Sequence, residues 1–433
     1  MEKAYLAAIM SLGISGIATA DVVFEPFDTV YSVGNRFYGL DIAVKPDGTL
    51  GYVHTTNDAQ GIQYRELGVS GGTTVSHSAW NNFAPRLAYD STGQAHITYY
   101  KAGDNDLYHN HQQNGDWQGA TKIGDTRGTT DLAIDADDNV HVSWQTATNG
   151  EARNHRYRML ANDGNWQSER IMFDSTTDFR TRAGASLLAA SSSEAYIFTQ
   201  SRLAASHNDG AAGNSPYVWA KTASGDFDRS TVPPEEYFAH SGGNDSTGQV
   251  SLFGGESRLY SADLMSAAFR GDAIDLAAIQ QWGSSTNSGS VTGYVTLYLD
   301  VLEGDSTPIR LYDASDASEV SMVIDSAGVH YVFFVAPYDS EDESTNNALW
   351  LQRVDETGEL LGDNVLLTEG TYDVQNIKAA IDGNDYLHLM FSVNGNEIWH
   401  TSALVPEPSS AMLALTGGAM LLLGRRKSRI ATS

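Results

Sequence analysis

One phrase recurs along the chain at a nearly constant spacing, and this repeat restricts the fold more than any other feature. The phrase joins an apolar strand start, an Asp, a turn of Gly, Asn or Asp, and a second apolar stretch that follows a His. Its anchors Lys45, Asp90 and Asp135 are separated by 90 − 45 = 45 and 135 − 90 = 45 residues. Asp325 and Asp382 anchor two later copies. A period of about 40 to 50 residues, with about four short strands per unit, is typical of a β-propeller blade.

Weaker copies begin at Leu188 and Leu252, which brings the number of units to seven. The sequence therefore predicts an all-β fold, a β-propeller over residues 21–404 with seven blades, and leaves six or eight blades open. The last unit ends one strand short, after residues 397–401, whereas an apolar segment at 22–31 precedes the first anchor. We expect strands from the two termini to complete one blade and close the ring, which would leave no open sheet edge.

The second and third units match each other best, over residues 85–166, and Trp117 and Trp166 each end a turn at a similar place. This phrase resembles propeller-like repeats of bacterial secreted proteins. The resemblance implies a fold and carries no agreed activity, because one fold supports many functions.

The first 20 residues have the three parts of a secretory signal peptide. Lys3 supplies positive charge, residues 4–17 are apolar, and Ala18-Thr19-Ala20 is a small-residue cleavage site. The apolar stretch is shorter than the ~20 residues that span a bilayer, and the alternative is a buried N-terminal helix. We therefore predict export through the Sec translocon and cleavage by signal peptidase after Ala20.

The C-terminal region, residues 405–429, also has three parts in a fixed order. Val405, Pro406, Glu407 and Pro408 form a stiff, extended tetrapeptide, because each proline fixes its own φ and restrains the residue before it. Residues 411–424 are apolar and uncharged. A basic cluster follows, made of Arg425, Arg426, Lys427 and Arg429. Positive charge directly after an apolar helix holds that end in the cytoplasm.

This order of parts resembles the PEP-CTERM sorting domain of Gram-negative, exopolysaccharide-producing bacteria. The resemblance implies a transmembrane helix that holds the protein in the inner membrane, and an exosortase that recognises Pro406-Glu407-Pro408 and removes the tail. Because the apolar stretch is short for a membrane span, part of residues 409–411 must also enter the membrane. The alternative is an ordinary tail anchor that is never cut.

Composition narrows the choice of partners. The formal net charge is −28, so the surface repels nucleic acid, and we predict no nucleic-acid partner. The chain has no cysteine, which excludes disulfides and thiolate zinc sites. We predict no bound metal and no cofactor.

Four histidines occupy a similar place in their repeat units: His96, His141, His330 and His388. They are candidate binding residues that would face the central channel of the propeller. A ring of imidazoles could bind a metal or an acidic group. Catalytic groups usually occur once in a protein, whereas this His recurs in four units. We therefore favour a role in the fold, such as a hydrogen bond to the backbone.

Acidic turns at residues 104–106, 135–138 and 340–344 are candidate calcium sites. Calcium needs six to eight oxygen ligands, and no stretch has the alternating Asp pattern of a calcium loop. Solvated turns are the favoured interpretation. The Asp-box motif typical of sialidases is missing as well, which weighs against a sialidase or another exo-glycosidase.

An arginine-rich segment supplies the main catalytic alternative. Arg156 and Arg158 share one face of a predicted strand, and His155 and Tyr157 share the other. A polysaccharide lyase needs Arg to neutralise a uronate carboxylate, and His or Tyr to remove the C5 proton. Acidic residues in the same segment nearly balance its charge, so a solvated outer strand is the favoured interpretation.

The predicted function follows from the two ends and from the repeat. No Ser-His-Asp elbow, phosphate loop or zinc-protease motif is present in the sequence. We predict an exported, exosortase-sorted protein of the cell surface or extracellular matrix, whose propeller binds polysaccharide or another surface component without catalysis. The alternative is a secreted polysaccharide lyase or glycoside hydrolase with its site at His155, Arg156 and Tyr157.

Overall fold

The computed structural model describes most of the chain between residues 22 and 405. The described ranges are 22–32, 37–56, 61–76, 82–101, 104–126, 130–146, 155–173, 179–203, 214–222, 227–228, 265–282, 292–302, 308–314, 317–338, 347–368, 370 and 372–405. Every regular element in them is a β-strand. They contain no helix that is long and apolar enough to cross a membrane.

The predicted export and sorting residues lie outside these ranges, apart from Val405. They are Ala18, Ala20, Pro406, Glu407, Pro408, Arg425, Arg426, Lys427 and Arg429.

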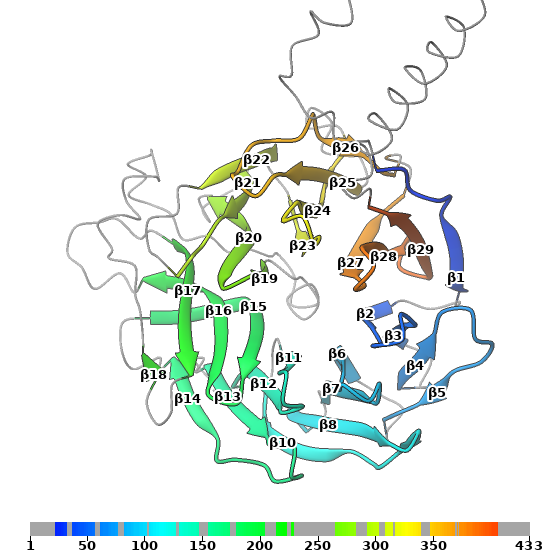
Figure 1. Cartoon of the computed structure of the whole chain (residues 1–433), viewed down its shortest axis with the longest axis vertical. Coiled ribbons are helices and arrows are strands. Elements are labelled where there is room, and N and C mark those ends of the chain that lie inside the picture. Colours follow the sequence, from blue (N-terminus) through cyan, green and yellow to red (C-terminus); the bar gives the residue numbers. More distant parts are fainter. Residues whose placement is uncertain are drawn as a thin grey trace, which may run out of the picture.

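The strands form seven sheets arranged side by side around a central axis (Figure 1). Sheet I contains β2 (Phe37–Val44), β3 (Leu50–Thr56), β4 (Ile62–Glu66) and β5 (Thr73–Thr74). Sheet II contains β6 (Asn82–Tyr89), β7 (Ala95–Lys101), β8 (Asp106–Gln113), β9 (Asp116–Trp117) and β10 (Thr121–Asp125). Sheet III contains β11 (Thr130–Ile134), β12 (Val140–Gln145), β13 (His155–Leu160) and β14 (Arg170–Phe173).

The later sheets repeat this order. Sheet IV contains β15 (Phe179–Ser191), β16 (Glu194–Leu203), β17 (Asn214–Thr222) and β18 (Phe227–Asp228). Sheet V contains β19 (Met265–Arg270), β20 (Ala273–Trp282), β21 (Thr292–Tyr298) and β22 (Ile309–Ala314). Sheet VI contains β23 (Glu319–Ile324), β24 (His330–Pro337), β25 (Asn347–Val354) and β26 (Val365–Leu366). Sheet VII contains β27 (Val374–Ile381), β28 (Tyr386–Val393) and β29 (Glu397–Leu404), together with β1 (Asp28–Ser32).

The innermost strands make contact in cyclic order. β2 contacts β6, and the sequence of contacts continues through β11, β15, β19 and β23 to β27, which contacts β2 again. All the pairings between strands are antiparallel, as expected where each sheet is a run of consecutive hairpins. The prediction of an all-β, propeller-like fold is therefore confirmed.

One sheet is completed by the two ends of the described chain. β1 pairs with β29, with Asp28 opposite His400 and Ser32 opposite Glu397. The contact continues beyond the strand, because the Thr401 hydroxyl donates a 2.6 Å hydrogen bond to the carbonyl of Glu25. The predicted sheet of N-terminal and C-terminal strands is thus present.

The hairpins between the first and second strands of sheets I, II, III, VI and VII share one turn. In each, the first residue accepts a hydrogen bond from the N–H three residues later, as Asp90 does from Gly93 at 2.9 Å and Asp135 from Asp138 at 3.1 Å. The fourth residue of the turn has positive φ, which is 81° for Gly93 and 63° for Asp138. Gly and Asp tolerate this left-handed conformation, so the Gly or Asp at this position of the repeat reflects a backbone requirement.

The core lies between the sheets rather than at the ring's centre. Six clusters of buried side chains fill the interfaces, and the largest cluster extends from sheet IV across sheet V to sheet VI. The second strand of a sheet is its most buried element. β12 is buried at every residue, and β24 at every residue except Pro337. Such strands need apolar cover on both faces, and the neighbouring sheets provide it.

A polar contact also crosses every interface at one position of the innermost strands. Ser186, Ser266 and Ser321 accept hydrogen bonds from backbone N–H groups of the next sheet at 3.1, 2.9 and 3.0 Å. Asp41 and Asp131 do the same for Leu87 and Leu187, at 2.8 and 2.7 Å. Arg86 with Asp131 and Lys378 with Asp41 close the remaining two interfaces as ion pairs of 3.4 and 3.6 Å.

The structure corrects one placement of the repeat. The innermost hairpin of sheet V is formed by β19 and β20, not by the copy assigned near Leu252, which lies outside the described residues. The turn between β19 and β20, at Gly271 and Asp272, is shorter than the repeated turn and lacks the Asp that begins it. The repeated pattern is therefore not recognisable in the sequence of this hairpin.

The interface contacts generate a stability prediction. Ser321→Ala removes the acceptor for the Ala379 N–H, and we expect a loss of about 1 to 2 kcal/mol in the free energy of unfolding. Urea denaturation measures this loss. Ser192→Ala, in an exposed turn, is the matched control and should change little. Equal effects of the two substitutions would contradict a stabilising role for the interface contact.

Candidate functional site

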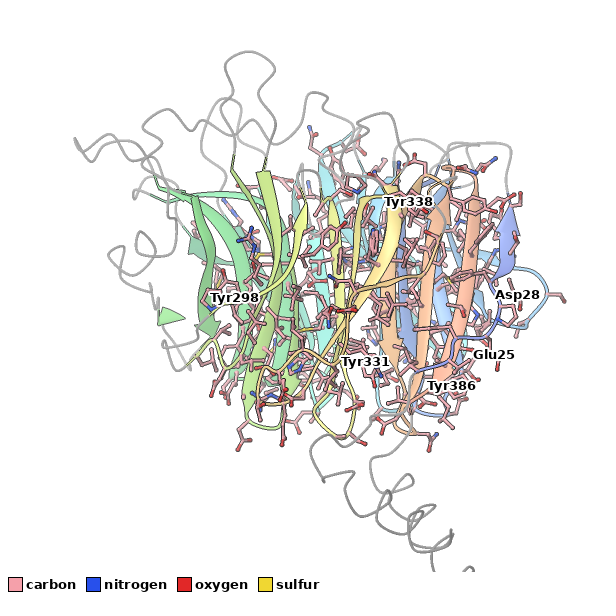
Figure 2. The ribbon with its side chains drawn as sticks, turned by 90° about the horizontal axis from the view of Figure 1, so that it is seen from above. Glu25, Asp28, Tyr298, Tyr331, Tyr338 and Tyr386 are labelled. Carbon is pink, nitrogen blue, oxygen red and sulfur yellow. The ribbon has the colours of Figure 1, made fainter. Side chains whose placement is uncertain are left out.

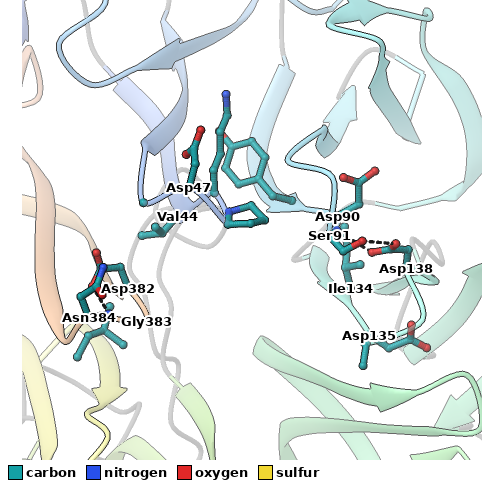
Figure 3. Close-up of a pocket in the computed structure, with 16 residues that line it drawn as sticks. Val44, Asp47, Asp90, Ser91, Ile134, Asp135, Asp138, Asp382, Gly383 and Asn384 are labelled. Atoms are coloured by element: carbon teal, nitrogen blue, oxygen red, sulfur yellow. Dashed lines mark hydrogen bonds between the residues drawn. The ribbon is translucent and has the colours of Figure 1, made fainter.

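A pocket of about 570 Å³ opens among the turns at one end of the ring (Figure 3). Its walls are the first turns of four sheets that follow one another around the ring, sheets VII, I, II and III. Residues 44–48, 89–91, 134–136, 138 and 381–384 line it. The pocket therefore exists only because the ring brings equivalent turns together.

The pocket is strongly acidic. Its lining contains five aspartates, Asp47, Asp90, Asp135, Asp138 and Asp382, against a single lysine, Lys45. The Lys45 ammonium is paired with Glu66, outside the lining, so it does little to offset this charge. Negative charge gathered in a concave site attracts cations and hydrogen-bond donors and repels anions.

Three of these carboxylates also hold their own turns together. Asp90 Oδ1 accepts hydrogen bonds from the N–H groups of Thr92 and Gln94, at 2.9 and 2.8 Å. Asp382 Oδ1 accepts from residues 384 and 386, both at 2.8 Å. Asp135 Oδ1 accepts from residues 137 and 139, at 2.9 and 2.8 Å. The repeated Asp is therefore a turn cap, in line with the favoured interpretation of the acidic turns.

A second contact ties neighbouring turns to each other. The N–H and the hydroxyl of Ser91 donate to the two carboxylate oxygens of Asp138 in the next sheet, both at 2.7 Å (Figure 3). Ser326 makes the equivalent pair of hydrogen bonds to Asp385. The pocket wall between sheets II and III is thus fixed by a bidentate contact across the interface.

Histidines lie directly behind three of the pocket's turns. His141 is fully buried, with Nε2 3.1 Å from Asp135 Oδ2 and Nδ1 2.7 Å from the hydroxyl of Tyr157. In sheet II, His96 Nδ1 lies 3.2 Å from His109 Nε2.

Sheet VII repeats this arrangement, with His388 Nδ1 3.2 Å from His400 Nε2. The three repeated histidines thus bond to side chains within their own sheets, which supports the predicted role in the fold. Within the described ranges, no group of three or more potential ligands is arranged to hold a metal ion.

His330 does not share their position, contrary to the sequence alignment. His96, His141 and His388 stand opposite Ala88, Ala133 and Ala380 on the first strand. In sheet VI the residue at that register is Tyr331, opposite Val323, and its hydroxyl donates to Asp325 at 3.1 Å.

His330 is one residue out of phase, so it points to the other face of the sheet. There its Nε2 lies 2.7 Å from Asp275 of sheet V. The prediction of four equivalent histidines was therefore wrong for this residue.

The residues of the catalytic alternative are placed on opposite faces of β13. His155 and Tyr157 are buried, and Tyr157 is bonded to His141. Arg156 is half-buried on the other face and pairs with Glu169. Arg158 is held by the carbonyls of Gln167 and Ile123, at 2.8 and 3.1 Å. The strand thus separates the arginines from His155 and Tyr157, as the alternation along it predicted.

The position of His155 in its sheet explains its burial. Leu107, Ile62, Leu349 and Ile398 occupy the corresponding position of β8, β4, β25 and β29, and all four are buried. Burial lowers the pKa of His155 to about 3, so the imidazole is neutral at ordinary pH. His155 lies in a slot that other sheets fill with an aliphatic side chain.

Three of the pocket carboxylates, those of Asp47, Asp90 and Asp135, have lowered pKa values that favour the ionised form. A hydrogen bond from the N–H of Thr49 lowers the pKa of Asp47. Burial alone would raise the pKa of Asp90 and of Asp135, but hydrogen bonds from their turns and from the histidines behind them outweigh it and leave both values lowered. A general acid needs the opposite shift, toward neutral pH.

Sequence reasoning found the Asp and His of the repeat but missed the pocket. Lys45 and Tyr89 belong to the wall where the repeat is broken, because Gly51 stands in the place of the repeated His. A Cβ atom at Gly51 would lie 1.7 Å from the Tyr89 hydroxyl, so Tyr89 fills that space. In the sequence, the Gly at position 51 in place of the repeated His was the sign that the first unit would form a different wall.

Comparison with known proteins supports the fold. No family model matches the chain, and no curated protein matches it. The solved structure of the polysaccharide lyase Uly1 superposes with a TM-score of 0.54 at 10% identity, over 91% of this chain and 96% of the lyase.

Two more distant structures also match. An α-L-arabinanase of Penicillium chrysogenum complexed with arabinobiose gives a TM-score of 0.44 at 10% identity, over 75% of this chain and 93% of the other. An ulvan lyase bound to -[GlcA(1-4)Rha3S]- gives 0.43 at 8% identity, over 75% and 77%. At these identities the likeness to Uly1 supports the fold alone.

The buried histidines generate a prediction about acid stability. Seven of them have a pKa lowered by burial, namely His54, His109, His111, His141, His155, His388 and His400. The unfolded chain takes up protons on these groups near pH 6.5, whereas the folded protein does not. The free energy of unfolding should therefore fall as the pH drops below about 6.5.

His155→Leu tests one member of this group. Because the folded pKa of His155 is about 3, this residue alone should account for about 2 kcal/mol of the stability lost between pH 7.5 and pH 5. Urea denaturation at the two pH values should show a correspondingly smaller loss in the variant. An unchanged loss would mean that His155 takes up its proton in the folded state.

Proposed function

We propose that the protein is exported and sorted to the cell surface or extracellular matrix, where its propeller binds a polysaccharide through the acidic pocket without catalysis. The propeller of this proposal has seven blades, one per sheet, a count supported by the cyclic contacts of the innermost strands. The non-catalytic part of the proposal is carried by Asp90 and Asp135, whose carboxylates cap turns and have lowered pKa values.

The size and charge of the pocket favour a particular kind of sugar. A cavity of about 570 Å³ is in the range of sites that hold small ligands, and it could take one end or a short stretch of a glycan. Ionised carboxylates accept strong hydrogen bonds from hydroxyl groups. They repel the carboxylates of uronic acids. We therefore propose a neutral or amino-sugar polysaccharide as the ligand.

One observation supports the alternative of a polysaccharide lyase or glycoside hydrolase. The fold resembles that of Uly1, a polysaccharide lyase. For a lyase centred on His155, the substrate would have to reach a fully buried imidazole on the face opposite Arg156. For a hydrolase in the pocket, one carboxyl group would have to be protonated near neutral pH, against the lowered pKa values of Asp47, Asp90 and Asp135.

Charge-removing substitutions test the pocket. Asp47→Asn and Asp382→Asn keep an oxygen that can accept the turn hydrogen bonds but remove one negative charge each. Because a hydrogen bond to a charged group contributes about 1.5 to 3 kcal/mol, we expect each to weaken binding about tenfold or more. Affinity electrophoresis in gels that contain neutral, amino-sugar or uronate polysaccharides provides the measurement.

Asp355→Asn is the matched control. Asp355 caps the same kind of turn, accepting from Thr357 and Glu359 at 2.9 and 2.8 Å, but it does not line the pocket. Equal losses in all three variants would place binding elsewhere. A steady rise in unsaturated-uronate absorbance, lost in His155→Ala, would support the lyase instead.

The sorting part of the proposal rests on the C-terminal sequence. The order of Pro406-Glu407-Pro408, the apolar stretch and the basic cluster supports recognition by an exosortase after translocation. We expect Glu407→Ala to leave the tail uncut in an exosortase-producing host, so that the full-length protein accumulates in the inner-membrane fraction. Immunoblots against a tag placed after residue 433 would detect the uncut tail.

Glu397→Ala, inside the propeller, is a control outside the motif. It should leave processing unchanged. Normal release of the Glu407→Ala variant would contradict recognition of the motif and favour a different anchor.

A further inference from the structure

The chain leaves the propeller at the end that carries the pocket. The N–H of Val405 donates a 3.0 Å hydrogen bond to the carbonyl of Asp385, the last residue of the turn whose residues 381–384 line the pocket. Leu404, the end of β29, is paired with Tyr386, which follows the same turn. In Figure 2, Tyr386 and Tyr331 lie toward one end of the strands, and Tyr338 lies at the other.

The N-terminal side of the described chain reaches the same end. Residues ahead of β1 continue along β29, and the N–H of Glu25 donates a 2.9 Å hydrogen bond to the carbonyl of Ser402. Val22 packs against the cluster that contains Val405. Val405 is thus fixed to the turn that lines the pocket, and the N-terminal residues lie at the same end of the strands.

The distance from this point to the predicted membrane helix is short. Val405 is buried, and the apolar stretch begins at Ala411 with residues 409–411 needed to complete a span. Only residues 406–408 therefore separate the folded domain from the membrane. Three residues span at most about 10 Å even when a chain is fully extended.

We infer that the pocket end of the propeller faces the membrane while the C-terminal tail is attached, and that removal of the tail opens the pocket to polymers. This inference rests on the sorting part of the proposed function and extends it. A spacer of three residues leaves room for small molecules at the pocket's edge but not for a polymer coil. The proposed sequence of events is then export, anchoring with the pocket covered, cleavage, and polysaccharide binding.

The chain is well suited to a test that uses no polysaccharide and no exosortase. It has no native cysteine, so a single introduced thiol reports local access. Asn384→Cys places the thiol in the pocket lining, and Asn396→Cys places it in the exposed turn at the other end of β28. The full chain is reconstituted into liposomes and labelled with a small maleimide or with a maleimide on a long polyethylene glycol chain.

We expect the long reagent to label Asn384→Cys several-fold more slowly than Asn396→Cys in liposomes, with the small reagent labelling both. An insertion of about 30 Gly and Ser residues after Pro408 should remove the difference, since such a linker spans about 30 Å. Equal rates for the long reagent without the linker would overturn the inference alone. Failure of the chain to float with the liposomes would contradict the membrane helix, and with it both the sorting proposal and this inference.

Discussion

The fold depends on the need to cover both faces of every sheet. A sheet of four strands with a fully buried second strand, such as β12, cannot exclude water by itself, and a linear stack would leave its first and last faces exposed. Cyclic contact of the innermost strands satisfies this need at every sheet. The pairing of β1 with β29 is what lets the last sheet reach the size of the others before it meets sheet I.

The acidity of the pocket follows from the same architecture. The turn that recurs in the first hairpins leaves N–H groups at the second and fourth positions after its first residue, and an Asp side chain accepts hydrogen bonds from them in several turns. Once the ring closes, these carboxylates gather at one end of the axis. Carboxylates that cap separate turns therefore share one surface, and hydrogen bonds from the turns help to lower the pKa values of Asp90 and Asp135.

The pocket wall differs from the other walls where the repeat is broken. At sheet I, Lys45 replaces the repeated Asp and Gly51 replaces the repeated His, and the Tyr89 side chain of sheet II occupies the vacant space. Its hydroxyl lies 3.0 Å from that of Tyr64, which in turn donates to Glu66 at 2.7 Å. At this wall the Tyr89 ring and Lys45, paired with Glu66, stand beside Asp47, whereas sheets II, III and VII each present the Asp of the repeat.

The sequence was informative where local chemistry repeats and uninformative where distant turns meet. Spacing of Lys45, Asp90 and Asp135 predicted the propeller-like fold, because each unit forms the same hairpins. The spacing did not distinguish His330 from the other repeated histidines. A shift of one residue along a strand moves a side chain to the opposite face of the sheet but hardly alters the sequence pattern. Nor could the spacing predict that residues near 46, 90, 136 and 383 share a pocket, because that depends on ring geometry.

Closure of the ring by the terminal strands also relates the two parts of the proposed function, which are sorting by the C-terminal tail and binding in the pocket. A ring whose last sheet is completed by β1 must bring both ends of the chain to that sheet. Because β1 and β29 are antiparallel, the entry to β1 and the exit from β29 lie at the same end of the strands. The first turn of sheet VII, which lines the pocket, lies at that end too. Ring closure therefore places the exit of the chain from β29 beside the pocket, so one geometric constraint connects the proposed anchoring to the proposed recognition.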